Sequence, residues 1–156
     1  MKIAMCCAKV AYNLKEAVKA HLLKRGYEVV DFCDNPSDPM PYAEVAARAA
    51  EGMLSSGCEL GVFFCGTGMG VSLVANMFKG ITAAPVESKF AARRARYTNN
   101  ANVLCLGSFI LGPVMACEMV DEFLNTSWLE GADEATRAIL KGQHDFIGTL
   151  ENDRFR

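Results

Sequence analysis

The sequence predicts an α/β fold with a five-stranded parallel sheet and helices on both faces. Three observations lead to this prediction. Short apolar runs alternate five times with helical segments, the connections between them are short, and no repeat or linker interrupts the pattern. Strands buried on both faces appear in sequences as such apolar runs. Because 156 residues suit one domain with a sizeable core, we expect residues 1–156 to form a single domain.

The first half of the chain contains two expected strands and two expected helices. The strands are short apolar runs, and the first helix has apolar residues at helical spacing and a glycine at its end. Three prolines between the second strand and the second helix require a loop. The expected ranges are strand 2–7, helix 12–26, strand 27–32, loop 33–41 and helix 42–57.

The second half continues the alternation with three more strands. The helix after the fourth strand is basic, and Ser88 is its expected N-cap because a serine hydroxyl can accept a hydrogen bond from the first turn. The expected ranges are strand 60–65, helix 68–77, strand 80–86, helix 88–100, strand 102–107, helix 113–126 and helix 132–143 with a polar tail after it.

Composition excludes several classes of function. The net charge of −2 gives no indication of nucleic acid or of a membrane surface, and the N-terminus lacks a signal-peptide cleavage region. The seven cysteines include no C-x-x-C pair and no zinc-ligand spacing, and several lie in apolar runs, as buried free thiols do. We therefore expect a cytoplasmic protein that binds no nucleic acid, membrane or metal.

The motif "CGTGMG" at residues 65–70 lies where the third strand becomes a helix. A dinucleotide fingerprint requires G-x-G-x-x-G/A, but Val71 occupies the last position, and a Walker loop requires a Gly-Lys-Ser/Thr that is absent here. Two interpretations remain open. The glycines and the helix N-terminus can form an anion site beside a thiol that ionises readily, or the motif is a tight turn with a structural cysteine.

Two longer stretches, "GVFFCGTGMGVSLVANMFKGITAA" (61–84) and "NNANVLCLGS" (99–108), resemble the ribose-5-phosphate isomerase B family, which includes galactose-6-phosphate isomerase subunits. The resemblance extends to about residue 130. It implies a Rossmann-like three-layer sandwich, a homodimer or homotetramer with active sites shared between subunits, and a C-terminal helix that reaches toward a partner. It also implies an aldose–ketose isomerase that moves a proton through a cis-enediolate, without metal or cofactor.

The resemblance assigns roles around the glycine loop. Cys65 matches the catalytic base, and Thr67 matches the neighbouring hydroxyl. Asn99 matches a substrate-contacting asparagine, and Tyr42 falls near a tyrosine that follows the second strand. The loop that would hold the enediolate oxygen comprises Gly66, Gly68, Met69 and Gly70.

The chain departs from the family pattern where that pattern opens sugar rings and holds phosphate. Ala8-Lys9 stands in place of Asp-His, and Thr98 in place of the ring-opening histidine. Arginine positions of the family hold Thr82, Phe109 and Asp133. The remaining candidates for substrate binding are Lys9, Arg96 and Arg137, whereas Arg93 and Arg94 are expected on the solvated surface.

We therefore expect a cofactor-independent aldose–ketose isomerase of a sugar or sugar phosphate, with Cys65 as its base. Because Thr98 cannot serve as a ring-opening acid, we hypothesise a substrate that is short or otherwise unable to close a ring. A four-carbon sugar with a terminal phosphate is such a substrate, since its ring-closing hydroxyl is blocked. Two alternatives stay open: a non-catalytic or partner-requiring subunit, and a sugar-binding protein without turnover.

Overall fold

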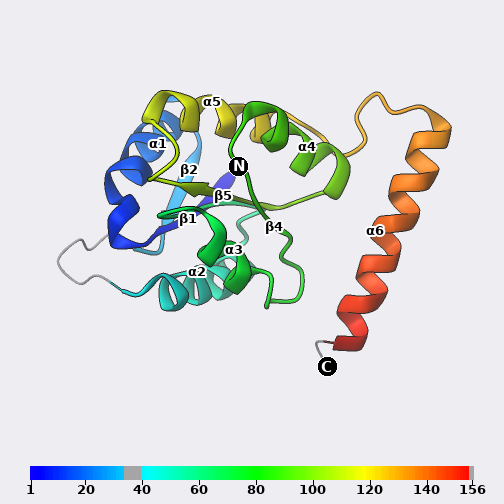
Figure 1. Cartoon of the computed structure of the whole chain (residues 1–156), viewed down its shortest axis with the longest axis horizontal. Coiled ribbons are helices and arrows are strands. Elements are labelled where there is room, and N and C mark those ends of the chain that lie inside the picture. Colours follow the sequence, from blue (N-terminus) through cyan, green and yellow to red (C-terminus); the bar gives the residue numbers. More distant parts are fainter. Residues whose placement is uncertain (34–39, 155–156) are drawn as a thin grey trace.

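The computed structural model describes residues 1–33 and 40–154, which form a five-stranded parallel sheet between two layers of helices (Figure 1). The strands lie in the order β2-β1-β3-β5-β4. The predicted fold class is confirmed. The elements are β1 (Lys2–Cys7), the 3-10 turn η1 (Lys9–Ala11), α1 (Tyr12–Lys24), β2 (Glu28–Asp31), α2 (Tyr42–Ser56), β3 (Leu60–Cys65), α3 (Met69–Ala75), β4 (Ala83–Pro85), α4 (Lys89–Asn99), β5 (Val103–Gly107), α5 (Pro113–Leu124) and α6 (Glu134–Arg154).

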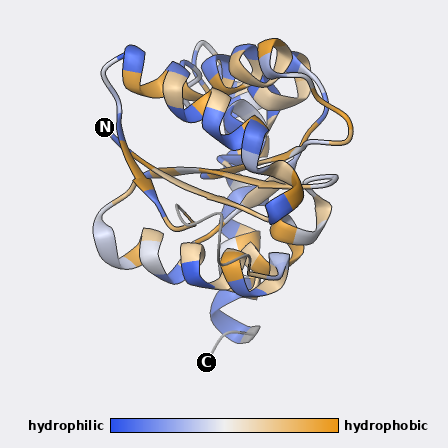
Figure 2. Ribbon diagram, turned by 90° about the vertical axis from the view of Figure 1, so that its left-hand side faces the viewer, coloured by the Kyte–Doolittle hydropathy of each residue, from blue (hydrophilic) through white to orange (hydrophobic). Residues whose placement is uncertain are grey.

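The sheet divides the core into two layers because successive side chains of a strand point to opposite faces. Along β3, Val62 and Phe64 pack in the core formed with α1, α4 and α5. Phe63 and Cys65 pack in the other core, formed with α2 and α3. Figure 2 shows the apolar strands between the two helical layers. Cys65 therefore lies at the end of its strand, on the side of the sheet that α2 and α3 cover.

The order of the strands reverses between β1 and β3. From β1 the chain moves outward to β2, whereas from β3 it moves outward on the other side to β4 and back to β5. Open α/β sheets bind ligands beyond the carboxyl ends of the strands at such a point. Cys7 pairs with Phe64, and the Ala8 N–H donates to the Phe64 carbonyl at 2.9 Å. The residues after β1 and β3 thus meet where a ligand site is expected.

Two expected elements differ from the structure at their ends. β4 comprises only Ala83–Pro85 instead of residues 80–86. Where the strand was expected to begin earlier, backbone N–H groups donate to asparagine side chains instead of to a neighbouring strand. The Ala83 N–H donates to Asn76 Oδ1 and the Thr82 N–H donates to Asn102 Oδ1, both at 2.8 Å. The last helix continues to Arg154, so the polar tail expected after residue 143 is wrong. Residues 34–39 of the expected proline-rich loop lie outside the described residues.

Helix α6 stands beside the two layers rather than within either of them (Figure 1). Near its start, Arg137 Nη2 donates to the Leu129 carbonyl at 3.2 Å, and near its end Glu151 Oε1 accepts from the Gly80 N–H at 2.6 Å. Apolar residues recur along its whole length at helical spacing, which explains why it extends beyond the expected range. The residues that stay largely exposed are Ile139, Phe146, Ile147 and Leu150.

Candidate active site

The glycine loop after β3 places a thiol against the start of α3. Cys65 is 6% exposed, and its Sγ accepts a hydrogen bond from the Gly68 N–H at 3.1 Å. An N–H donor stabilises the thiolate form of a cysteine over the neutral thiol. Thr67 is exposed, and its Oγ1 accepts from the Met69 N–H at 3.4 Å. The loop thus holds a buried sulfur and an exposed hydroxyl two residues apart.

Each glycine of the loop meets a different neighbour. Gly68 has φ +80°, and a Cβ there would lie 2.9 Å from the Cys105 carbonyl oxygen, so the loop packs its backbone against β5. A Cβ at Gly66 would lie 2.5 Å from the Phe109 ring, and one at Gly70 would lie 2.7 Å from the Tyr42 ring. Close packing on β5 therefore requires a glycine at position 68, whatever the loop binds.

Two aromatic side chains therefore cover the loop at Gly66 and Gly70. The Phe109 N–H donates to the Gly66 carbonyl at 2.9 Å, which fixes its backbone, while its ring is 73% exposed. Tyr42 begins α2 and is 49% exposed. The position of Tyr42 agrees with its expected place near the site. The family pattern had placed Phe109 at an arginine position, but the contact of its ring with the loop depends on how β5 pairs with β3.

Lys9 follows β1 on the same edge of the sheet. Its side chain is exposed and forms no ion pair within residues 1–33 and 40–154. The next residue, Val10, accepts a hydrogen bond from Ser108 Oγ at 3.1 Å, which ties the end of β1 to the segment that carries Phe109. The end of the first strand thus lies beside the segment that carries Phe109, and the exposed Lys9 is next to it.

Asn99 lies at the opposite end of the sheet. Helix α4 runs back from the carboxyl edge, and the nearby Asn102 carbonyl accepts from the Gly61 N–H at the start of β3. Four residues of strand, on the order of 13 Å, separate Gly61 from Cys65. Asn99 therefore cannot contact a substrate held at Cys65 of the same chain.

Arg96 and Arg137 are the two other basic residues expected to contact the substrate. In the structure both donate hydrogen bonds to groups of the same chain. Arg96 Nη1 donates to Asn100 Oδ1 at 3.1 Å and to the Ala101 carbonyl at 2.9 Å. Burial lowers the pKa of its guanidinium. Arg137 Nη2 donates to the Leu129 carbonyl. Both arginines lie with Asn99 on the side away from the glycine loop.

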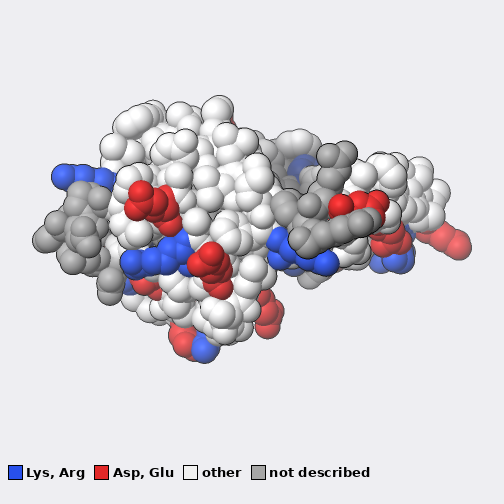
Figure 3. Space-filling view, turned by 90° about the horizontal axis from the view of Figure 1, so that it is seen from below, with Lys and Arg blue, Asp and Glu red and all other residues white. Residues whose placement is uncertain are grey.

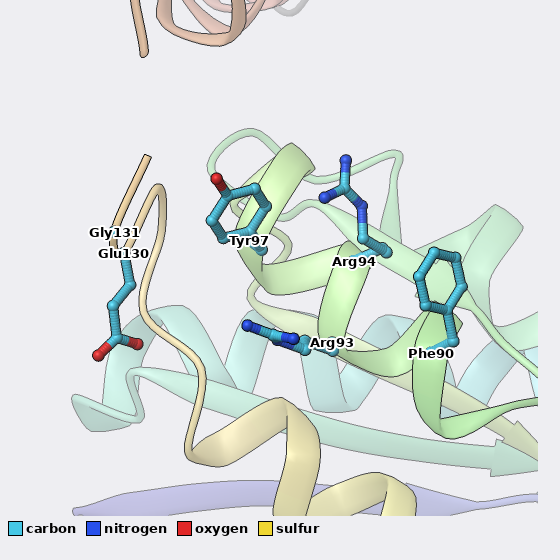
Figure 4. A pocket seen from close by; sticks show the side chains of 6 residues that line it. All are labelled: Phe90, Arg93, Arg94, Tyr97, Glu130 and Gly131. Carbon is cyan, nitrogen blue, oxygen red and sulfur yellow. The ribbon is translucent and has the colours of Figure 1, made fainter. Parts of the chain in front are cut away.

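A pocket of about 330 Å³ opens on that side, between α4 and the segment before α6 (Figure 4). Arg93 and Arg94 project into it and form no ion pair within the described part of the chain. Arg94 lies over the Tyr97 ring, 5.0 Å from its centroid. The remaining lining residues are Phe90, Glu130 and Gly131. The two arginines, expected to be ordinary surface charges, thus share an aromatic-walled pocket.

Charge is otherwise sparse around the glycine loop. Figure 3 shows few charged side chains, of both signs, over the face that α2 and α3 cover. Among the described residues, no three His, Cys, Asp or Glu side chains gather as metal ligands would. The helices of residues 1–33 and 40–154 include none with the length and apolar character to cross a bilayer.

Comparison with known proteins matches this geometry to a family. The model of the Ribose/Galactose Isomerase family matches residues 3–140. The chain belongs to this family. It is therefore an aldose–ketose isomerase, with the Rossmann-like fold of the family. A solved ribose-5-phosphate isomerase B from Clostridium thermocellum superposes with a TM-score of 0.88 at 34% identity, covering 98% of this chain and 99% of that one.

Two curated relatives of this isomerase carry names that specify a four-carbon sugar. A 4-deoxy-4-sulfo-D-erythrose isomerase from Clostridium sp. (strain MSTE9) is 39% identical over 100% of this chain and 99% of its own length. A D-erythrulose-4-phosphate isomerase from Pectobacterium atrosepticum is 32% identical over 93% of this chain and 95% of its own. The family includes members named for substrates shorter than a pentose.

Proposed function

We propose that this isomerase acts on an open-chain four-carbon sugar that bears a terminal anion, with Cys65 as the base. One observation supports the proposal above all. The buried Cys65 sulfur accepts a hydrogen bond from the Gly68 N–H, and it lies at the end of β3, where the order of the strands reverses. Proton abstraction beside a carbonyl requires a base and a preorganised anion site in one small volume. The end of β3 and the glycine loop supply both.

The thiolate of Cys65 takes the proton from C2 of the aldose, and the pair of electrons moves into an enediolate. The backbone of the glycine loop, Gly66 to Gly70, holds the enediolate oxygen, and the Thr67 hydroxyl lies beside it. The proton of the C2 hydroxyl passes to O1, and Cys65 returns its proton to C1, which leaves a carbonyl at C2 and yields the ketose. The packing of Gly68 on β5 keeps sulfur and loop in one rigid arrangement.

Substrate length follows from what the site lacks. Thr98 stands where the family pattern has its ring-opening histidine, and the Thr98 Oγ1 is buried without a hydrogen-bond partner in the described part of the chain. An enzyme without this acid is suited to a substrate that never closes a ring. A tetrose whose C4 carries phosphate or sulfonate has no hydroxyl left for a furanose. Both four-carbon relatives are named for substrates of this kind.

We favour a sulfonate over a phosphate as the terminal anion. Phosphate esters carry about −1.5 to −2 charges at pH 7, whereas a sulfonate carries one. Three arginine positions of the family pattern hold Thr82, Phe109 and Asp133, so the chain has fewer cations to balance a dianion. A relative that matches over the whole chain is named for a sulfonated sugar.

We further propose a cytoplasmic single-domain protomer, residues 1–156, that works as a homodimer or homotetramer. Asn99 lies at the other end of the sheet from Cys65, and Arg93 and Arg94 lie on α4, which covers the opposite face of the sheet, so we assign them to the partner's site. The exposed apolar stripe of α6 offers a surface for that contact. The arginine pocket is then the candidate holder of the substrate's anion, in addition to Lys9.

The test compares turnover of the purified chain on 4-deoxy-4-sulfo-erythrose, erythrose 4-phosphate and ribose 5-phosphate. We expect kcat/KM to be highest for the sulfonated tetrose and lowest for ribose 5-phosphate. Equal or better turnover of ribose 5-phosphate would contradict the proposal. A chain that binds the sugar but exchanges no C2 proton with deuterated water would be a binding protein, and one that turns over only with a homologous subunit would be a partner-requiring subunit.

A further inference from the structure

Two cysteines face each other where β1 and β2 end. The register of the two strands runs from Lys2 opposite Glu28 to Met5 opposite Asp31, and the same offset places Cys7 opposite Cys33. Their sulfurs lie 3.2 Å apart, and both thiols are free. Neighbouring strands lie about 4.7–4.9 Å apart, within the ~4.4–6.8 Å between Cα atoms that a disulfide spans. The spacing of the strands therefore suits a disulfide, and forming it requires the two sulfurs to approach from 3.2 Å to about 2.05 Å.

The two thiols have different surroundings. Cys33 is half-buried, and its Sγ accepts from the Cys7 N–H at 2.8 Å. Hydrogen bonds from Cys7 lower the pKa of the Cys33 thiol and outweigh burial and the Asp31 carboxylate, both of which raise it. The hydrogen bond to Cys33, together with burial, raises the pKa of Cys7. Cys33 is thus the accessible and more acidic sulfur, and Cys7 is a buried neutral thiol beside it.

No other thiol of the described chain has this arrangement. Burial raises the pKa of Cys6, Cys105 and Cys117, which makes these sulfurs poor nucleophiles. Cys65 belongs to the catalytic loop. The pair at the ends of β1 and β2 is separate from that loop, because Cys7 lies in the core layer of α1 and Cys65 lies in the layer of α2 and α3.

We propose that Cys7 and Cys33 form a reversible oxidation site for hydroperoxides, with Cys33 as the attacking sulfur and Cys7 as the resolving one. The Cys33 thiolate attacks the distal oxygen of the hydroperoxide, so an S–O bond forms, the O–O bond breaks, and the leaving alkoxide takes a proton to become an alcohol. Cys7 then attacks the resulting sulfenic sulfur: the S–S bond forms, and the hydroxide leaves as water with the Cys7 proton. Two thiols are oxidised, and one hydroperoxide is reduced to alcohol and water.

The test treats the full-length chain with stoichiometric hydrogen peroxide and follows intact mass, free thiols and the peptides that remain joined after proteolysis. We expect the intact mass to fall by two hydrogens and a peptide linked through Cys7 and Cys33 to appear. Treatment with dithiothreitol should restore the original mass and both free thiols. Cys33→Ser should abolish the linked peptide. The matched control is Cys117→Ser, which removes another half-buried cysteine and should leave the rate at which the linked peptide forms unchanged.

A second variant separates the chemistry from any effect on folding. In Cys7→Ser the sulfenic acid of Cys33 has no resolving thiol, so dimedone should label Cys33 and the linked peptide should be absent. The oxidised wild-type chain should also melt above its reduced form, since the bond closes a loop of the unfolded chain. Peroxide that consumes Cys65 or Cys117 before Cys33, or dimedone labelling that spares Cys33 in Cys7→Ser, would overturn the proposal.

Discussion

Cys65 owes its assigned chemistry to two features of its surroundings. It ends a buried strand, which fixes its backbone, and the first free N–H of the following turn points at its sulfur. The strand–glycine–helix pattern of residues 60–75 was enough to predict both the position of this thiol and the turn after it. What the pattern did not predict is the pair of aromatic rings on the loop, because Tyr42 and Phe109 arrive from distant parts of the chain.

Replacing the base should abolish catalysis without unfolding the protein. We expect Cys65→Ala to lower kcat by about 10²–10⁴-fold or more, with substrate affinity and Tm nearly unchanged. The matched control is Cys105→Ala, which removes a buried thiol from the neighbouring strand in the same core layer. Steady-state kinetics on the best tetrose substrate, with thermal melts of both variants, make the comparison. Near-wild-type kcat in Cys65→Ala would refute the role assigned to this sulfur.

Phe109 should set the length of the substrate. Its ring lies on Gly66, the residue after Cys65. We propose that it fills space that a longer sugar would need. We expect Phe109→Ala to raise the kcat/KM ratio of ribose 5-phosphate to the tetrose substrate by about tenfold, corresponding to roughly 1.4 kcal/mol of discrimination. Ile110→Ala, which trims the adjacent exposed residue, is the control and should leave the ratio unchanged. If Phe109→Ala left this ratio of kcat/KM values unchanged, the Phe109 ring would not determine the length of the substrate.

Elements of the fold were predictable to different degrees. Strands with continuous apolar runs, such as β3, and helices with clear spacing were placed correctly from local pattern. β4 was overestimated because the side chains of Asn76 and Asn102 replace its backbone partners, which no local pattern reveals. The length of α6 was underestimated because its apolar residues are interrupted by polar ones and several of them stay largely exposed. The candidate site was predictable at the glycine loop, whereas contacts between elements required the fold.

One buried charge cluster joins α1 to β2. Lys15 has a side chain with no exposed surface, and its Nζ bonds Asp31 Oδ2 at 2.5 Å, while Lys19 bonds the same oxygen at 2.8 Å. Burial alone would raise the pKa of Asp31, but the bonds from Lys15 and Lys19 outweigh it and lower the pKa. The carboxylate therefore stabilises the fold above its ordinary pKa of 3.8, and this stabilisation is lost as the pH falls through the lower pKa of the folded state.

Breaking this cluster should cost far more than a surface ion pair. Asp31→Asn removes the buried carboxylate of Lys15 and leaves only the half-exposed Glu16, at 2.6 Å, as its partner. We expect a loss of up to about 3–5 kcal/mol in the free energy of unfolding at pH 7. The loss should shrink toward acidic pH, because the wild-type protein then loses the same charge. Urea unfolding between neutral pH and pH 3 measures both effects. The control is Glu28→Gln, which removes the exposed partner of Lys2 and should change stability by under about 1 kcal/mol. If the difference in unfolding free energy between wild type and Asp31→Asn stayed constant across the pH range, the role assigned to the Asp31 carboxylate would be wrong.

At the scale of the whole molecule, the proposed site has two halves that one chain does not bring together. Cys65 and Lys9 lie at the carboxyl edge of the sheet, whereas Asn99 lies at the amino edge and the arginine pocket lies on α4, over the face of the sheet opposite Cys65. A closed two-fold arrangement would pair each half with its complement twice, since both partners present the same surfaces. The apolar stripe of α6 and the exposed side chains of α3, Leu73 among them, provide area for such a contact.

Mixing two inactive variants tests this arrangement directly. Cys65→Ala and Asn99→Ala are each expected to have little turnover, but a hybrid dimer of the two contains one site with Cys65 from one protomer and Asn99 from the other. Random exchange makes about half the dimers hybrid, with one working site in two, so activity should recover to about a quarter of wild type. Arg93→Ala combined with Arg94→Ala should complement Cys65→Ala in the same way if the pocket serves the partner. Co-expression with two different affinity tags isolates the hybrids, and turnover per hybrid dimer is the readout. If the wild-type protein is dimeric and the hybrids stay inactive, Asn99 does not belong to the catalytic site. The role of Cys65 is tested separately, by the kinetics of Cys65→Ala.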